Sequence, residues 1–232
     1  MQEGGRFSVV RHRGRFALLL AAIIGAFAVQ GIATPGPAEQ VVVAFLLSAT
    51  LLLAMWAADA RAFVLRASAV IGVVVVVASV VEAATGSVDT SATRLANLLL
   101  VTLAPPAVVV GAVRTLRARN IVTIEVIVGA LCLYMLVGMF FAVLYGSIGH
   151  ISGTFFANGV PDTVAHCQYF SFTTLTTTGY GDLTAATNLG HTLSVSEALL
   201  GQIYLVTIVS VIVGNLGRAR RPANAVDGQS NT

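Results

Sequence analysis

Long apolar stretches dominate the pattern of hydrophobic and polar positions along the chain. Six runs, each long enough to cross the hydrocarbon core of a bilayer as a helix, are separated by polar or Pro/Gly-containing breaks. The runs span residues 16–33, 41–58, 67–84, 95–113, 121–145 and 189–216. They are continuous and lack the alternation of a membrane β-barrel strand. The pattern therefore predicts an all-α integral membrane protein with six transmembrane helices.

The arginines set the expected orientation of these spans. All 13 basic residues are arginines, and only Arg94 lies on the outer side of the predicted topology. The others share the opposite side: Arg6, Arg11, Arg13, Arg15, Arg61, Arg66, Arg114, Arg117, Arg119, Arg218, Arg220 and Arg221. Since positive residues beside membrane spans stay in the cytoplasm, we expect both termini to be cytoplasmic in a multi-pass protein of the cell membrane. Residues 146–188 then face outside.

Composition excludes several other classes of protein. Hydrophobic residues make up 56% of the 232 and charged residues 10%, which is too apolar for a water-soluble domain. We expect no nucleic-acid partner, because the arginines form no stripe interleaved with aromatic residues. No nucleophile–base pairing, metal cluster or phosphate loop appears, so we expect no enzymatic activity. Cys132 and Cys167 are interpreted as core residues, and a disulfide between them is the alternative.

The start of the chain allows two interpretations. Its arginines, its apolar run and the small-residue stretch Gly31-Ile32-Ala33 resemble a cleaved signal peptide. The apolar run is at the long end for such a signal, which favours a retained first span. The topology downstream is the same in either case.

The connection between the fifth and sixth spans carries the candidate functional chemistry. Pro161, with Asp162 or Thr163 as N-cap, predicts a short helix over residues 164–175. This helix is too short to cross a bilayer, and a loop at residues 176–182 follows it. A re-entrant helix and loop are tolerated in a membrane only where their backbone is buried in protein or lines water. We therefore expect the loop to line a pore.

Backbone carbonyl oxygens are suitable groups for lining a pore that conducts cations. A cation crosses quickly when carbonyl oxygens replace its hydration shell without adding a fixed charge that traps it. Successive carbonyls point the same way only in conformations that L-residues disfavour, and Gly179 and Gly181 permit these at alternate positions. The Thr177 hydroxyl is expected to add one more oxygen at the inner end of the loop.

Side chains behind the loop are expected to support it. The Tyr180 ring should pack outward against the short helix, beside Phe170 and Phe172. Glu197 lies about two turns into the sixth span and is expected to bond backbone or hydroxyl groups such as those of Thr173-Thr174. Direct contact between Glu197 and an ion is the alternative.

The loop resembles the potassium-channel signature in its sequence Thr177-Thr178-Gly179-Tyr180-Gly181-Asp182. Its flanks are similar to bacterial members of that family with a two-helix pore module, in the segments Tyr169-Phe170-Ser171-Phe172-Thr173-Thr174-Leu175 and Glu197-Ala198-Leu199-Leu200-Gly201. The resemblance covers roughly residues 121–216.

By this resemblance, the carbonyls of four residues line sites for K⁺, the permeant ion: Thr177, Thr178, Gly179 and Tyr180. Gly181 and Asp182 complete the filter as supporting residues, and no other cofactor is implied. Thr178 departs from the family, which more often has Val or Ile there, and we expect altered packing behind the filter rather than lost selectivity.

A filter of this kind is a ring of four loops, and this chain holds one. The resemblance therefore implies a homotetramer embedded among membrane lipids, with a ring that includes a related subunit as the alternative. Two other functions compete with a channel subunit. A secondary transporter would show two similar halves with interrupted helices in matching positions, and no such repeat is found. A non-conducting regulatory subunit is disfavoured by the intact filter sequence.

The predicted organisation is a cytoplasmic N-terminus at residues 1–15, a voltage-sensor-like four-helix domain at 16–119, a pore domain at 120–216 and a cytoplasmic tail at 217–232. The fourth span has no charged residue and is expected to break at Pro105-Pro106, so it cannot carry gating charge and steep voltage gating is not expected. The short tail leads us to expect no cytoplasmic ligand-binding domain in this chain.

The sixth span holds two further candidates. Gly201 is either a hinge on which the inner helices open or a small residue that lets the short helix pack closely. Leu205, Val209 and Val213 recur every four residues and predict either an apolar gate or an ordinary packing face.

Overall fold

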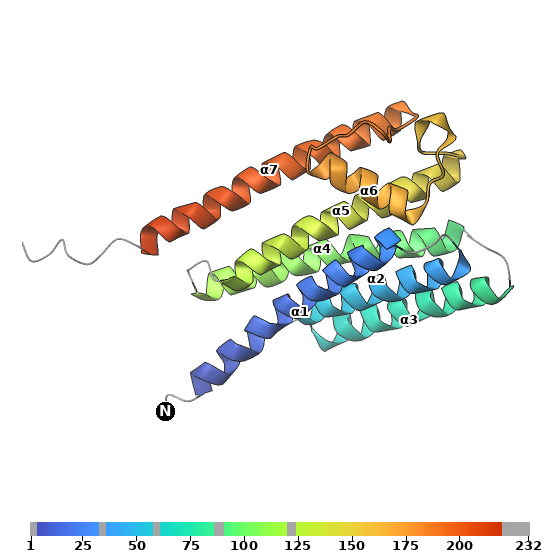
Figure 1. Ribbon diagram of the computed structural model, residues 1–232. Helices are drawn as coiled ribbons and strands as arrows, with labels where there is room; N and C mark the ends of the chain where they lie inside the picture. Colours follow the sequence, from blue (N-terminus) through green and yellow to red (C-terminus); the bar gives the residue numbers. More distant parts are fainter. Residues whose placement is uncertain (1–3, 33–35, 58–60, 86–90, 120–123, 220–232) are drawn as a thin grey trace, which may run out of the picture.

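The computed structural model describes residues 4–32, 36–57, 61–85, 91–119 and 124–219. A helix covers each predicted span: α1 (Gly4–Ile32), α2 (Pro37–Ala57), α3 (Ala62–Thr85), α4 (Ser91–Arg119), α5 (Ile124–Ser152) and α7 (Asn188–Ala219). Between α5 and α7 lie a single 3₁₀ turn, η1 (Ala157–Gly159), and the short helix α6 (Val164–Leu175). The all-helical fold expected from the sequence is confirmed across the described residues (Figure 1).

Four helices within the described ranges are long and apolar enough to cross a membrane. Their qualifying segments are Arg15–Ile32, Ala38–Ala57, Ala62–Thr85 and Val126–Ser152. In α4 the apolar stretch is the shorter segment Ala96–Val110. Four of the predicted spans are therefore confirmed as candidate membrane helices, and spans through α4 and α7 stay predictions.

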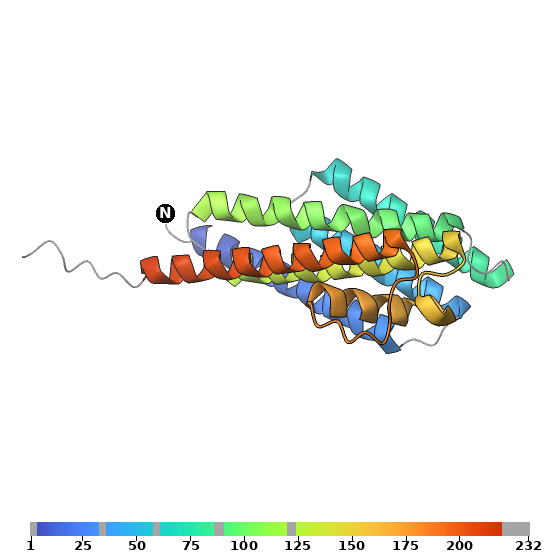
Figure 2. The same ribbon diagram turned by 90° about the horizontal axis from the view of Figure 1, so that it is seen from above.

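The long helices lie side by side in one elongated bundle (Figures 1 and 2). Helix α2 packs against α1, α3 and α4, while α5 packs against α1 and α4. Helices α6 and α7 pack against each other and against α5. The described start of α1 and end of α7 lie at one end of the bundle, and α6 lies toward the other (Figure 1). Both described ends thus lie at the same end of the bundle, and their cytoplasmic location stays a prediction.

The main core lies where α1, α2, α4 and α5 meet. Its members have little or no exposed surface, and include Leu19, Ile23, Leu47, Leu51, Leu100 and Leu136. Because lipid is as apolar as leucine, this contact is held by close packing rather than by exclusion of water. Helix α1 is therefore an integral part of the core. By contrast, α3 leaves a row of valines exposed, as a helix facing lipid does.

The break expected at Pro105-Pro106 is absent, because α4 continues through both prolines. Proline removes a backbone hydrogen bond without forbidding a helix, and packing against neighbouring helices compensates for that loss in membranes. Ala104, Ala107 and Val108 are all buried around this point, which holds the helix in place.

Neither cysteine forms a disulfide, and both are buried. Cys132 belongs to the main core, and Cys167 lies in a second aromatic cluster around α6. Their interpretation as core residues is confirmed.

Candidate functional site

The candidate site is built on α6, whose bounds match the predicted helix. Thr163 is the N-cap, and its hydroxyl accepts a hydrogen bond from the His166 backbone N–H at 3.1 Å. Asp162 has another role: its carboxylate oxygens each lie 3.0 Å from the Phe155 backbone N–H, which donates to them. The two polar residues before α6 thus fix its first turn and the approach from α5.

The loop after α6 turns back onto the end of that helix. The backbone N–H groups of Thr178 and Gly179 donate to the Thr173 carbonyl at 2.8 and 3.1 Å, and Thr177 N–H donates to the Thr174 carbonyl at 2.9 Å. In a trans peptide the N–H and the preceding carbonyl point in opposite directions. The carbonyls of Thr177 and Thr178 therefore point away from α6.

Alternate residues of the loop adopt left-handed backbone conformations. The φ angles are +57° at Thr177, +52° at Gly179 and +80° at Gly181. Glycine accepts such angles at little cost, whereas a β-branched residue is strained there. The alternation expected at the two glycines is present, and it extends one step further, to Thr177.

The Tyr180 ring lies against the short helix as predicted, but its neighbour there is Tyr169 rather than Phe170 or Phe172. It is 71% exposed and stacks on Tyr169, with the ring centroids 6.2 Å apart and the planes 7° from parallel. The Tyr169 hydroxyl donates to Asp182 Oδ2 at 2.9 Å, and this bond raises the pKa of Tyr169. One tyrosine of α6 therefore holds two residues of the loop, and Asp182 supports the loop through it.

The two phenylalanines support α6 from behind instead. Phe170 is buried against Tyr145, Phe155 and Phe156, with ring centroids 5.3–5.8 Å away. Phe172 points to the other side of α6, where its ring lies edge-on to that of Phe27 in α1 at 4.7 Å. The prediction failed because α6 turns these rings away from the loop, into contacts with α5 and α1.

Glu197 is fully buried behind α6. Its Oε2 accepts a hydrogen bond from the Tyr145 hydroxyl of α5 at 2.5 Å, and its Oε1 lies 2.5 Å from the Ser171 hydroxyl of α6. The Ser171 hydroxyl also lies 2.7 Å from the Gly138 carbonyl. The expected bonding of Glu197 to hydroxyl groups is present, but the partners are Tyr145 and Ser171 rather than Thr173-Thr174, because Ser171 lies on the face of α6 toward α5 and α7. Glu197 thus joins the three helices that surround the loop.

Two threonine hydroxyls of the loop have partners near its inner end. Thr177 Oγ1 accepts a hydrogen bond from Gln202 Nε2 of α7 at 3.1 Å. The hydroxyls of Thr178 and Thr176 lie 2.9 Å apart. The side chain of Thr178 is thus engaged within the loop.

Gly201 is where α7 passes the end of α6. It is buried, and a Cβ there would meet the Leu175 carbonyl at a distance that real atoms do not adopt. The packing alternative accounts for this glycine, and a hinge role stays a prediction. In the predicted gate stripe, Leu205 is exposed, and the side chains of Val209 and Val213 lie outside the described residues.

Sequence reasoning missed several residues of this site. Tyr145, Ser171, Tyr169 and Gln202 make its hydrogen bonds, and Gly138 leaves room for Phe172. For Ser171 the sequence did carry a signal. It lies between Phe170 and Phe172, so its side chain points to a different face of α6 from either phenylalanine ring. For the others, no local pattern marks a partner in another helix.

A family model described as an ion transport protein matches residues 36–222 of the 232. The chain belongs to the ion transport protein family. Members of this family are membrane-embedded, oligomeric ion channels and not enzymes. The match runs from α2 through α7, so it includes the candidate loop and three of the four helices that precede α5. Searches of curated proteins and of solved structures each found no match.

This membership confirms the expected ion channel and the expected lack of enzymatic activity at the level of the family. The ion that an ion transport protein selects depends on its pore. For this member the residues in question are those of the loop at 176–182, described above.

Proposed function

We propose that the chain is a subunit of a potassium-selective channel, in which four copies surround one pore. K⁺ crosses passively through a filter made of the loop carbonyls of Thr177, Thr178, Gly179 and Tyr180, with the Thr177 hydroxyl as a further oxygen. Helix α6 and this loop are the re-entrant part of a six-span membrane topology.

The observation that carries the proposal is the backbone of the loop. Alternate left-handed residues at 177, 179 and 181 let successive carbonyls share one direction. N–H groups of three loop residues bond to the end of α6, which leaves the carbonyls of Thr177 and Thr178 to face away from it. A stack of oxygens without a fixed charge suits a weakly hydrated monovalent cation.

Exposed loop residues and apolar side chains on one side of the subunit support its assembly with other copies. All residues from 176 to 182 are exposed, as are Leu199, Leu200, Ile203 and Val206 of α7. Four subunits meeting through this side would cover those apolar side chains and bring four loops around one axis. A closed cyclic assembly of identical chains follows the usual symmetry of oligomers.

The orientation follows from the arginines. The ends of α2 and α4 lie with the described chain ends at one end of the bundle, opposite α6 (Figure 1). Arg61 follows α2, and Arg114, Arg117 and Arg119 belong to the last turns of α4, so these arginines are on that side. By the positive-inside rule, that side is cytoplasmic, and the filter opens outward at the cell membrane.

Helix α4 gives the subunit little means of sensing voltage. The sequence has no charged residue between Leu95 and Val113. A segment without charge gains no energy from the membrane potential when it moves. The channel is therefore not steeply voltage-gated.

The test is ion flux through the purified protein in liposomes, with K⁺ and Na⁺ gradients imposed separately. Gly179→Val places a β-branched residue at φ +52°, where strain of about 1–2 kcal/mol turns the loop backbone. Gly159→Val is the matched control, since Gly159 has φ +70° with open space around it and lies outside the loop.

We expect K⁺ flux far above Na⁺ flux in the wild type and in Gly159→Val, and loss of that preference in Gly179→Val. Equal passage of both ions through folded wild-type protein would contradict potassium selectivity. An unchanged preference in Gly179→Val would contradict the assignment of the filter to this loop.

A further inference from the structure

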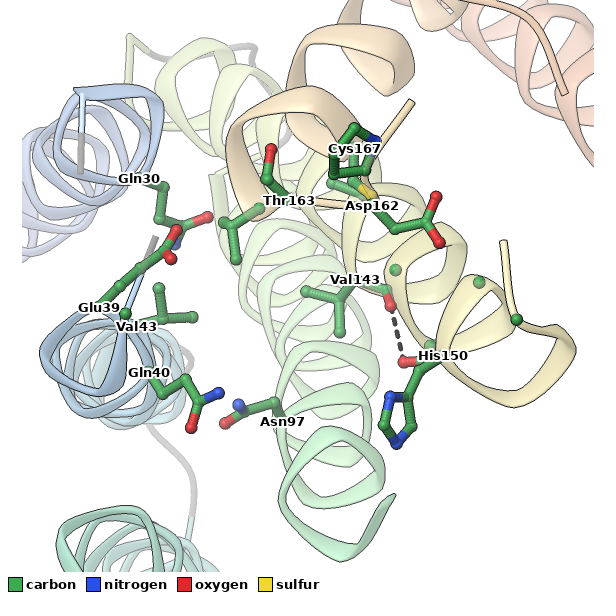
Figure 3. Close-up of a pocket in the computed structure, with 18 residues that line it drawn as sticks. Gln30, Glu39, Gln40, Val43, Asn97, Val143, His150, Asp162, Thr163 and Cys167 are labelled. Atoms are coloured by element: carbon green, nitrogen blue, oxygen red, sulfur yellow. Dashed lines mark hydrogen bonds between the residues drawn. The ribbon is translucent and has the colours of Figure 1, made fainter. Parts of the chain in front are cut away.

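A cavity of about 470 Å³ lies near the α6 end of the bundle, apart from the candidate filter. Its walls come from α1, α2, α4, α5, the start of α6 and the segment that leads into it (Figure 3). The polar part of the wall includes Gln30, Glu39, Gln40, Asn97, His150 and Asp162. A cavity of this volume with mixed walls is the size of a small-molecule site.

Three amide groups of this wall have buried polar atoms without a hydrogen-bond partner: Gln30 Nε2, Gln40 Oε1 and Asn97 Oδ1. Gln30 is 2% exposed and Asn97 is 9% exposed. Buried polar atoms are nearly always bonded, so unsatisfied ones on residues around one cavity point to a polar ligand there. Figure 3 shows the Gln40 and Asn97 side chains pointing toward each other across this space.

The charge of the wall selects the kind of occupant. Glu39 and Asp162 contribute two carboxylates, and Glu39 is 8% exposed. The described lining residues include no arginine or lysine. Because the two carboxylates face no arginine or lysine among the described lining residues, the cavity favours a cationic donor.

We propose that this cavity binds an ammonium group carried by a small, partly apolar molecule. An ammonium has three donors and no acceptor, which matches the Glu39 carboxylate and the two amide oxygens. Val43, Ala142 and Val164 give the apolar wall for the rest of the molecule. A bare metal ion fits less well: no cluster of three or more His, Cys, Asp or Glu side chains is arranged for one in the described part of the chain.

The position of the cavity gives the occupant a way to act on the pore half of the chain. Gln30, Gln40 and Asn97 belong to α1, α2 and α4, whereas Asp162 and Thr163 lead into α6. An occupant therefore contacts both halves at once, beside the N-cap of the helix that carries the filter loop. This gives the first four helices a ligand-binding role that is independent of the ion path.

Calorimetric titration of the purified full chain in detergent tests the site directly. The probe is phenethylammonium, and phenethyl alcohol is the neutral molecule of similar shape. We expect saturable binding of the amine and affinity about tenfold or more lower for the alcohol. Glu39→Gln keeps the shape of the side chain and removes its charge, and should weaken amine binding about tenfold or more. Glu82→Gln, outside the cavity, is the matched control and should leave affinity unchanged.

A second variant, Asn97→Leu, removes one unsatisfied oxygen and should also weaken the amine. Protection of the buried Cys132 from thiol reagents verifies that each variant is folded. The proposal is overturned if folded wild-type protein binds no amine, if the amine and the alcohol bind alike, or if Glu39→Gln binds as the wild type does. It is also overturned if Gly179→Val abolishes binding, because the amine would then occupy the filter.

Two sources of the ammonium are separated by repeating the titration in lipid nanodiscs. Competition when phosphatidylethanolamine is included assigns the site to a lipid headgroup. Equal binding with and without that lipid assigns it to a soluble amine.

Discussion

Replacement of Glu197 tests how the candidate filter loop is held in place. This carboxyl is fully buried and lies 2.5 Å from both the Tyr145 and the Ser171 hydroxyls, on α5 and α6. It is therefore the one side chain of α7 that bonds to both neighbouring helices behind the loop in the described structure. Removing it should loosen all three helices together.

The number of protons available for hydrogen bonding indicates whether the Glu197 carboxyl is ionised or neutral. The Ser171 hydroxyl has one proton and two acceptors within reach, the Gly138 carbonyl and Glu197 Oε1. An ionised Glu197 makes the two acceptors share that proton, whereas a neutral Glu197 can donate to Ser171 and free it for Gly138. Burial also penalises a charge that has no cationic partner. We predict that Glu197 is neutral and that glutamine can replace it.

The magnitude follows from the contacts. Glu197→Ala leaves the buried Tyr145 hydroxyl without its acceptor, which costs about 1–3 kcal/mol. Loss of the Cγ methylene and the void left by the missing carboxyl group add about 1–2 kcal/mol. At about 2–4 °C per kcal/mol for a chain of this size, the unfolding midpoint falls by roughly 10 °C. Glu197→Gln keeps one donor and one acceptor in place and should cost about 1 kcal/mol or less.

The two buried cysteines provide the assay. Cys132 is 0% exposed and Cys167 is 2% exposed, so a thiol-reactive dye reports opening of the main core and of the α6 cluster as the protein is heated. We expect the wild type and Glu197→Gln to become labelled at nearly the same temperature, and Glu197→Ala at a much lower one. Glu82→Gln controls for removing a carboxyl elsewhere. If Glu197→Gln is as unstable as Glu197→Ala, an ionised carboxylate is required and the proton count is wrong.

Two glycines allow further predictions with the same assay. Gly201→Ala should destabilise the protein by about 2 kcal/mol or more, because the new methyl meets the Leu175 carbonyl; Gly214→Ala in the same helix has open space and should stabilise it by up to about 1 kcal/mol. Equal effects would show that helix propensity, rather than packing, governs Gly201. Gly138→Ala places a methyl 2.7 Å from the Phe172 ring and should cost about 1–3 kcal/mol, with Phe172→Leu restoring part of the loss. A double variant no better than Gly138→Ala would refute that contact.

The sequence predicted those features that depend on local chemistry. Apolar runs with breaks located all six long helices, since a membrane span must satisfy its backbone internally. The Pro161–Thr163 start signal located α6 with its observed bounds. Gly179 and Gly181 indicated left-handed backbone, because only glycine adopts it readily.

Features that depend on which faces of different helices meet were not predicted. Helical spacing places Phe170 and Phe172 on different faces of α6, but it does not say which neighbour each face contacts. The structure turns Phe172 to α1 and leaves Tyr169 to stack on Tyr180. The strain at Thr177 was missed for another reason: a threonine gives no local sign of a positive φ, which the hydrogen bonds to α6 impose from outside.

These contacts also explain how a strained loop stays in one conformation. A left-handed β-branched residue costs about 1–2 kcal/mol, and persists only when its surroundings fix it. Helix α6, which fixes the loop, is itself held from three sides: the Gln168 side chain donates to the Phe27 carbonyl of α1 at 3.0 Å, Ser171 bonds to α5, and Gly201 of α7 lets the Leu175 carbonyl approach.

Because one of those three sides is α1, the four-helix part of the chain bears directly on the geometry of the loop. A substitution such as Gln168→Leu removes a contact to α1 without touching the loop or α7. If this variant loses ion selectivity while its unfolding midpoint stays close to that of the wild type, the first four helices position the candidate filter as well as stabilise the bundle. Packing around α5, α6 and α7 is then sufficient reason for this ion channel to keep its first four helices.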